Sequence, residues 1–286
     1  MHAHPVRYSA LPFRWSFVAA HFAPAAASIA LASSLLAQGV TPSPPPGPIP
    51  ATAAHRFATR ATVVALATVA TMPFDVRLAE EARDGALQRS RGLHDAAVAF
   101  DAAGDPGVLI ASAVMYGAGR ATRSPRLERI GLHAGEAVVI GGIATAVLKA
   151  VAGRQRPYVV AGDADDFTPF RVSNGHTSFP SGHTTVAFAF AAAVTAELAT
   201  ESSRAAWIGG PLLYAGASLV GVARMYGDKH WASDVVLGAG IGTLAGLETV
   251  AFSRTHARNR VERIFGSITV APAAHGAMIS LGNGQR

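Results

Sequence analysis

Apolar and polar stretches alternate along most of the chain, and this pattern predicts a bundle of α-helices. Between Arg56 and His256, apolar segments of helical length are separated by short polar connections. Their positions predict six helices, at roughly 57–74, 106–119, 131–150, 183–199, 205–224 and 233–252. No internal repeat is visible, which excludes a solenoid. The expected fold is therefore an all-α, six-helix bundle.

The two ends of the chain follow other patterns. Residues 1–37 have the order of a secretory signal peptide, since two arginines precede an apolar run that ends at Ala37. A cleaved signal, a retained anchor and a non-spanning cytoplasmic extension all remain open. Residues 38–55 are rich in proline and predict a linker. The helical domain is expected over 56–256, and short alternating stretches in the tail, 257–286, predict one or two surface strands.

Composition narrows the class of protein. Half of the residues are hydrophobic, 15% are charged, and the mean hydropathy is +0.29, whereas about 25% of an ordinary soluble domain is charged. This excludes a disordered chain and a charged coiled coil. However, most of the uncharged helix cores have only about 12–14 residues, fewer than the about 20 that span a bilayer. Membrane insertion and a soluble, exported domain with an apolar core are therefore both left open.

Arginine placement indicates a topology for the membrane alternative. Arginines crowd the connection between the second and third helices and follow the sixth. The positive-inside rule makes both regions cytoplasmic, so that the connections 149–182 and 224–234 lie on the outer, periplasmic side of the envelope. Both termini of the six helices are then inside. An arrangement with both termini inside conflicts with a cleaved signal peptide, because cleavage would leave the start of the first helix outside.

Charge and cysteine content exclude several functions. The net charge is +6, but the basic residues are scattered among apolar runs, so no nucleic-acid partner is predicted. The absence of cysteine excludes disulfides, cysteine-based zinc sites, iron–sulfur clusters and cysteine nucleophiles. Asp163, Asp165 and Asp166 do not complete a calcium loop, and no metal site is predicted. Gly238, Gly240, Gly242 and Gly246 lie in an apolar helix, where small residues favour close helix packing rather than a dinucleotide loop.

The first polar cluster follows the third predicted helix. Lys149 ends the apolar run, and Gly153 and Pro157 prevent the helix from continuing. Lys149 and Arg156 are thereby held where an apolar helix meets solvent. Taken alone, the cluster also fits cations that complement the dipole of a helix C-terminus.

The second cluster precedes the fourth predicted helix and reads Pro-Ser-Gly-His. Ser181 is a suitable N-cap, and Gly182 permits close approach to the free N–H groups, which could bind an anion. His183 lies at the rim of this pocket, where it could transfer a proton. The alternative is an ordinary capped helix with a surface histidine.

The third cluster precedes the sixth predicted helix. Arg224 ends the preceding helix, and His230 and Asp234 are four positions apart, so on a helix they share one face. A carboxylate in that position fixes the imidazole tautomer and raises its basicity. The alternative is a solvated turn with a local His–Asp pair.

Together, the three clusters are suited to phosphoryl transfer. Three cations and a helix N-terminus would neutralise the phosphate oxygens. Of two histidines, one could attack phosphorus and the other could protonate the leaving oxygen.

In sequence, Lys-x6-Arg-Pro, Pro-Ser-Gly-His and Arg-x5-His-x3-Asp follow one another in this order, within a stretch of roughly residues 57–253 that carries the resemblance described next. This arrangement resembles the type 2 phosphatidic acid phosphatase superfamily, which includes lipid phosphate phosphatases, bacterial non-specific acid phosphatases and vanadium haloperoxidases. The resemblance implies a helical bundle and hydrolysis of phosphate monoesters without a cofactor or metal, with vanadate binding as a phosphate mimic. It implies a nucleophile at His230, oriented by Asp234, and a general acid at His183. Phosphate ligands are implied at Lys149, Arg156, Ser181, Gly182 and Arg224.

The substrate expected from the apolar body is a phosphorylated lipid, such as a phosphatidic acid-like or polyprenyl phosphate. A vanadium-dependent haloperoxidase, a non-specific periplasmic acid phosphatase acting on small esters, and a membrane protein without activity are the alternatives. One position departs from the family pattern, because Ala223 stands where the third motif usually has serine. Loss of one hydrogen bond costs about 0.5–1.5 kcal/mol, enough to reduce activity without abolishing it.

Overall fold

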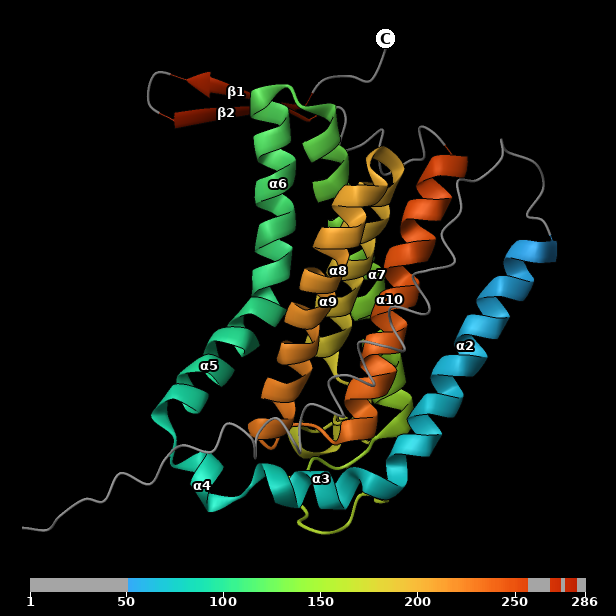
Figure 1. The fold of residues 1–286 in the computed structure, drawn as a ribbon, viewed down its shortest axis with the longest axis vertical. Coiled ribbons are helices and arrows are strands. Elements are labelled where there is room, and N and C mark those ends of the chain that lie inside the picture. Colours follow the sequence, from blue (N-terminus) through green and yellow to red (C-terminus); the bar gives the residue numbers. More distant parts are fainter. Residues whose placement is uncertain (1–50, 257–267, 274–275, 282–286) are drawn as a thin grey trace, which may run out of the picture.

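The computed structural model describes residues 51–256, 268–273 and 276–281, and within them the chain is a helical bundle (Figure 1). The helices are α2 (Ala51–Thr71), α3 (Asp75–Ala82), α4 (Gly85–Gln88), α5 (Arg91–Ala102), α6 (Val108–Thr122), α7 (Pro125–Ala152), α8 (Gly182–Glu201), α9 (Ser203–Tyr226) and α10 (Ala232–Thr255). Two antiparallel strands follow, β1 (Ile268–Ala273) and β2 (Gly276–Leu281). The predicted signal segment and linker residues 38–50 lie outside the described residues.

The all-α bundle is confirmed, and each of the six predicted helices has a counterpart. Two differences follow from the composition of the segments. Helix α2 begins at Ala51, inside the predicted linker, because Ala51–His55 contains three alanines, which favour helix. Helices α3 to α5 were not predicted, since charged residues interrupt every apolar run between 75 and 102. The structure therefore has seven helices of twelve residues or more among the described residues, not six.

Local signals set the ends of α7, the helix that carries Lys149. The Ser124 hydroxyl accepts a hydrogen bond from Leu127 N at 3.5 Å, and Pro125 occupies the first turn. At the other end Gly153 has φ +58°, and a Cβ there would lie 1.8 Å from the carbonyl oxygen of Thr168. Only glycine can make this turn, which directs the chain into the loop before α8.

The surface of the bundle has the character of a membrane protein. Five described segments are long and apolar enough to cross a membrane: 52–82, 91–122, 125–152, 203–226 and 232–255. Large apolar side chains cover their outer faces, among them Trp207, Leu212 and Leu66, which are 82%, 70% and 64% exposed. The uncharged runs in the sequence are shorter than these segments, because single polar residues interrupt helices that continue on both sides. Such an exposed surface fits lipid rather than water, so the chain is placed in a membrane.

Helix α8 lies at the centre of the bundle, against α7, α9 and α10, and its packing against α10 depends on glycine. A Cβ at Gly242 would lie 2.2 Å from the Thr185 carbonyl oxygen of α8, and one at Gly246 would lie 2.6 Å from Ala192 Cβ. A Cβ at Gly240 would lie 2.2 Å from a Val64 methyl group of α2. The interpretation of these glycines as packing residues is confirmed.

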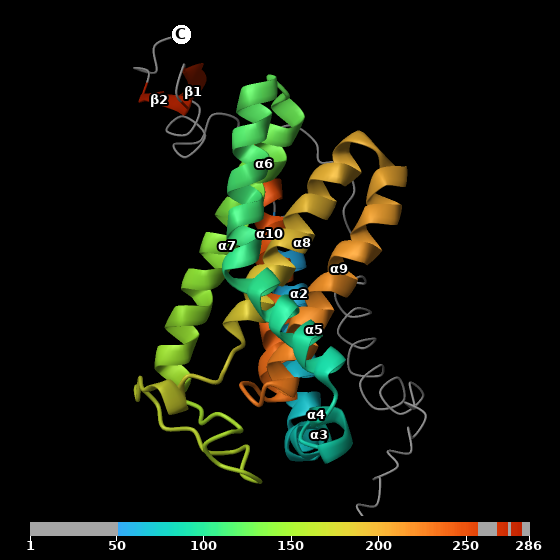
Figure 2. The same cartoon turned by 90° about the vertical axis from the view of Figure 1, so that its left-hand side faces the viewer.

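The connections divide between the two ends of the bundle. The loop between α7 and α8 and the connection between α9 and α10 lie at the same end, where α3 and α4 cross beneath the long helices (Figures 1 and 2). The α6–α7 and α8–α9 turns lie at the opposite end. At that end Arg126 and Arg129 pair with Glu201 at 2.9 and 2.8 Å, and Arg120 pairs with Glu128 at 2.9 Å. The three polar clusters are thus gathered at one end, away from the arginine-rich turn.

Candidate active site

The histidine of the third cluster is deeply buried beside a carboxylate. His230 is 3% exposed, and its Nδ1 lies 3.4 Å from Asp234 Oδ2. His230 lies in the connection before α10 and not on a helix. The shared helical face that the four-residue spacing would allow is therefore not formed, although the two side chains are close. Because Nδ1 faces the carboxylate, Nε2 is the ring nitrogen left for chemistry.

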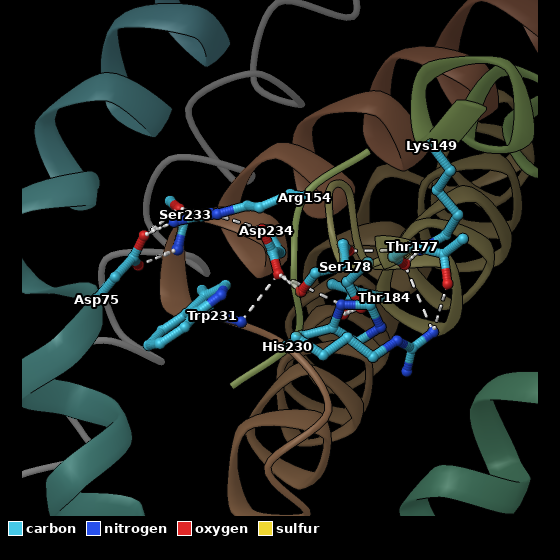
Figure 3. A network of polar contacts seen from close by, with 12 residues as sticks. Asp75, Lys149, Arg154, Thr177, Ser178, Thr184, His230, Trp231, Ser233 and Asp234 are labelled. Carbon is cyan, nitrogen blue, oxygen red and sulfur yellow. Dashed lines mark hydrogen bonds and ion pairs between the residues drawn. The ribbon is translucent and has the colours of Figure 1, made fainter. Parts of the chain in front are cut away.

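The Asp234 carboxylate is held on both oxygens. Oδ2 accepts hydrogen bonds from Trp231 N at 2.9 Å and from the Ser178 hydroxyl. Oδ1 accepts from Arg154 Nη1 at 2.7 Å. Figure 3 shows this network running from Asp75 through Arg154 and Asp234 toward His230. The orientation of the carboxylate is therefore fixed by contacts with three separate segments.

Burial and charge keep His230 neutral. Burial, together with the charges of Lys149 and Arg156, lowers the pKa of His230 to about 3, although Asp234 opposes this shift. An imidazole that is unprotonated at neutral pH has a lone pair available for attack. The same cations would lie next to an anion bound against this ring.

Lys149 and Arg156 both reach the segment before α8. Lys149 Nζ donates to the carbonyl oxygens of Thr177 and Ser178, the latter at 3.3 Å. Arg156 Nη2 donates to the Thr177 carbonyl and hydroxyl oxygens at 3.4 and 3.3 Å. The first and second clusters are thus joined through one residue, Thr177.

Two arginine N–H groups at the site have no acceptor among the residues that the structure describes. Arg156 Nε and Arg224 Nε are both buried and lack a hydrogen-bond partner in the described part of the chain. Buried donors are nearly always satisfied. A pair of such donors is suited to an anionic oxygen, which guanidinium groups bind strongly.

The start of α8 differs from its expected form. The Ser181 side chain does not cap the helix; it is fully buried and bonds to Thr184 Oγ1 at 2.8 Å, while Ser181 N donates to Asp234 O at 3.0 Å. Its hydroxyl is therefore directed into the helix. Gly182 remains near the cations, because a Cβ there would lie 3.8 Å from Lys149 Cε.

His183 lies at the more open side of the site. Its side chain is 25% exposed, and its Nε2 lies 3.7 Å from Asp101 Oδ1 on α5. The same Asp101 oxygen pairs with Arg224 Nη1. Burial and the charge of Arg224 lower the pKa of His183, while Asp101 and Asp105 oppose this shift. His183, the candidate general acid, therefore lies next to a carboxylate that it shares with Arg224, and the sequence did not reveal this contact.

The structure brings together every predicted site residue and adds several. Lys149 lowers the pKa of both His183 and His230, so its charge lies near both imidazoles. Arg154 and Ser178 stand within the stretches that carry the motifs, and their position there was the signal that could have found them. Asp75 and Asp101 are on helices that were not predicted. No group of three His, Cys, Asp or Glu side chains among the described residues could hold a metal ion.

Comparison with known proteins finds a family model that matches the segment containing these motifs. Residues 130–258 match the model of the PAP2 superfamily, and this segment contains all three clusters. Lipid A 1-phosphatase of Porphyromonas gingivalis is 44% identical over 71 residues, 24% of this chain and only 15% of that relative. A transmembrane PAP2-type phosphatidylglycerolphosphate phosphatase from Bacillus subtilis is similar in structure, with a TM-score of 0.48 and 22% identity, covering 82% of this chain and 98% of that one.

Proposed function

Because residues 130–258 match the model of the PAP2 superfamily, we propose that the chain is a membrane phosphatase that hydrolyses lipid phosphate monoesters through a phosphohistidine on His230. The observation that carries this proposal is the buried pair of unpartnered donors, Arg156 Nε and Arg224 Nε, beside a neutral buried imidazole. Together they form an anion site with a nucleophile.

In the first step, His230 Nε2 attacks phosphorus in line with the ester oxygen. The N–P bond forms as the P–O ester bond breaks, and the electron pair of the broken P–O bond stays on the leaving oxygen. His183 gives that oxygen a proton, so the alcohol leaves neutral. Lys149, Arg156 and Arg224 hold the three remaining phosphate oxygens and stabilise their charge.

In the second step, water attacks the phosphohistidine. His183, now neutral, accepts a proton from the water as the new O–P bond forms and the P–N bond breaks. Inorganic phosphate is released, and His230 returns to its neutral state. Asp234 stabilises the imidazolium character that develops on His230 in both steps, because its carboxylate already lies 3.4 Å from Nδ1.

The surroundings of the site support a lipid substrate. Five apolar segments place the bundle in a membrane, and the lipid named for the Porphyromonas gingivalis relative is lipid A. Phosphatidic acid-like, polyprenyl and lipid A phosphates share a phosphate monoester on an apolar anchor. We propose that the site opens on the outer, periplasmic side, because the arginine-rich turn lies at the opposite end of the bundle.

The test is phosphate release by detergent-purified protein, from lipid phosphates and from water-soluble esters. Lipid esters should have the higher kcat/KM, vanadate should compete with them, and rapid quenching with labelled substrate should trap a phosphoenzyme. His230→Ala should abolish both turnover and trapping. Phosphate release by His230→Ala at the wild-type rate would overturn the mechanism. Bromide oxidation by the vanadate-loaded protein with peroxide would instead favour the haloperoxidase alternative.

The orientation can be tested separately. The chain has no cysteine, so one cysteine introduced at Arg171, in the loop between α7 and α8, reports on one side of the membrane. Membrane-impermeant maleimide should label Arg171→Cys in intact cells but not a cysteine at Arg123, in the α6–α7 turn. The reverse pattern would contradict an outer site.

A further inference from the structure

A second arginine of the first cluster, Arg154, has a different role from Arg156. Arg154 is 1% exposed and uses all five of its N–H donors. They bond to Ala164 O at 2.9 and 2.7 Å, Ser233 Oγ at 2.8 Å, Asp234 Oδ1 at 2.7 Å and Asp75 Oδ2 at 2.7 Å. No donor is left for phosphate. Arg154 therefore holds other residues of the site in place and does not bind the anion itself.

Three aromatic rings confine the Arg154 guanidinium. Its Cζ lies 5.0 Å from the Phe167 ring centroid, 5.6 Å from that of Trp231 and 5.8 Å from that of Phe179. Trp231 is in turn held by a hydrogen bond from its Nε1 to Gln155 O at 2.9 Å. The cation is thus fixed by both its donors and its faces.

The second anion on Arg154 is Asp75, from the first turn of α3. Asp75 is fully buried, and its Oδ1 accepts a hydrogen bond from Ser233 N at 2.8 Å. Ser233 is in the first turn of α10, where backbone N–H groups have no partner within the helix. A carboxylate from another helix therefore caps α10 just before Asp234, the residue that orients His230.

The consequence for Asp234 is geometric. Arg154 holds Oδ1, and this leaves Oδ2 turned toward His230 (Figure 3). If Arg154 moved, the carboxylate could rotate and the direction of the imidazole would no longer be defined. Asp75 determines where Arg154 lies and also fixes the backbone that carries Asp234.

We infer that Asp75 and Arg154 are positioning residues for the His230–Asp234 pair, acting together through Ser233. This inference rests on the proposed function. It also assigns a role in the reaction to α3, which lies outside the segment 130–258 that matches the family.

The decisive variant is Asp75→Asn, which keeps the shape of the side chain and removes its charge. Outer hydrogen-bond partners of metal ligands typically contribute about 10- to 100-fold to affinity or activity, and we expect an effect of the same order for the partners of a nucleophile. We expect kcat to fall by that factor while KM changes less than about twofold, because Lys149, Arg156 and Arg224 are untouched. Phosphoenzyme formation should slow in proportion.

A matched control separates positioning from stability. His133 and Glu197 form an equally buried pair, 2.8 Å apart and 3% and 4% exposed, on α7 and α8 away from the site. Glu197→Gln should lower Tm in detergent but leave kcat unchanged. If Asp75→Asn lowers Tm in the same way and leaves kcat at the wild-type value, the inference is wrong. A higher KM with unchanged kcat would equally overturn it.

Ser233→Ala provides a milder variant if Asp75→Asn does not fold. It removes the hydroxyl that joins Asp75 to Arg154 but keeps the backbone N–H, and a several-fold loss of kcat is expected. The double variant should lose little more than Asp75→Asn alone, because residues that act as a unit are not additive. Fully additive losses would contradict joint action. A wild-type protein inactive on every ester would overturn the proposed function itself, whereas an unchanged kcat in these variants overturns only the positioning role.

Discussion

The site contains two histidine–carboxylate pairs, and they differ in almost every physical respect. The side chains of His230 and Asp234, at the floor, are 2% and 0% exposed, and the carboxylate is held by several further hydrogen bonds. His183 and Asp101, at the mouth, are 25% and 42% exposed, and their carboxylate oxygen is shared with Arg224. The floor pair is buried and held in one orientation, while the mouth pair is more exposed and shares its carboxylate with a second cation.

This difference matches the demands of the two proposed roles. A nucleophile must stay neutral and keep one direction, and burial provides both. A general acid must give up a proton and then recover one, and that requires access to solvent. The same pair of residue types therefore serves two functions because the surroundings differ.

The largest effect that tests this comparison is expected at the two histidines. His230→Ala should remove turnover for every substrate, by about 10⁴-fold or more, since no attacking group remains. In kcat/KM, which reports formation of the phosphohistidine, His183→Ala should cost about 10²- to 10⁴-fold with an alkyl phosphate, but far less with p-nitrophenyl phosphate, whose leaving group needs no proton. Steady-state kinetics with both esters would measure this. Equal losses for both esters in His183→Ala would remove the distinction between floor and mouth.

A smaller effect should follow from removing the charge at the mouth. Asp101 and Asp105 raise the pKa of His183, whereas burial, Arg224 and Lys149 lower it. Asp101→Asn should lower that pKa further, so the proton needed for the leaving group is lost at a lower pH. The alkaline limb of kcat should move down by up to about one pH unit.

The same substitution frees Arg224 from its carboxylate partner. Inhibition by inorganic phosphate should therefore become several-fold tighter in Asp101→Asn. Asp95→Asn, the same change at an exposed position of α5, provides the control and should alter neither property. An unchanged pH profile in Asp101→Asn would show that the mouth carboxylate does not act on His183.

The smallest effect is expected at Ala223, where a hydroxyl is missing beside Arg224. Ala223 is 7% exposed, and Ala223→Ser would introduce one hydrogen-bonding group. One such bond is worth about 0.5–1.5 kcal/mol, which corresponds to a gain in kcat/KM of about two- to tenfold. Competition between lipid and water-soluble esters would show whether substrate range also changes. A loss of activity would mean that serine does not fit this helix contact.

Much of this arrangement could be predicted from the sequence. Long apolar runs marked six helices, and the motif residues His183, His230 and Asp234 were identified by their spacing. Asp75 and Asp101 could not be found in this way, because their helices are short or charged, and each aspartate lies at least 79 residues before the groups that it contacts. Ser181 stands at the predicted N-cap position, but the hydrogen bond of its side chain could not be predicted, because the choice between capping and bonding to Thr184 depends on tertiary packing.

The contact of Gly242 with the Thr185 carbonyl oxygen has a consequence for how the enzyme can vary. Helix α8 carries the proposed proton donor, and α10 carries the carboxylate that contacts the proposed nucleophile. The alignment of these two groups therefore depends on a seam between α8 and α10 with no space for a methyl group. A position two turns from Asp234, without any reactive group of its own, should therefore tolerate mutation as poorly as the histidines do. Directed evolution for new substrates would have to leave this seam intact and find its diversity in α5 and the loops around the mouth.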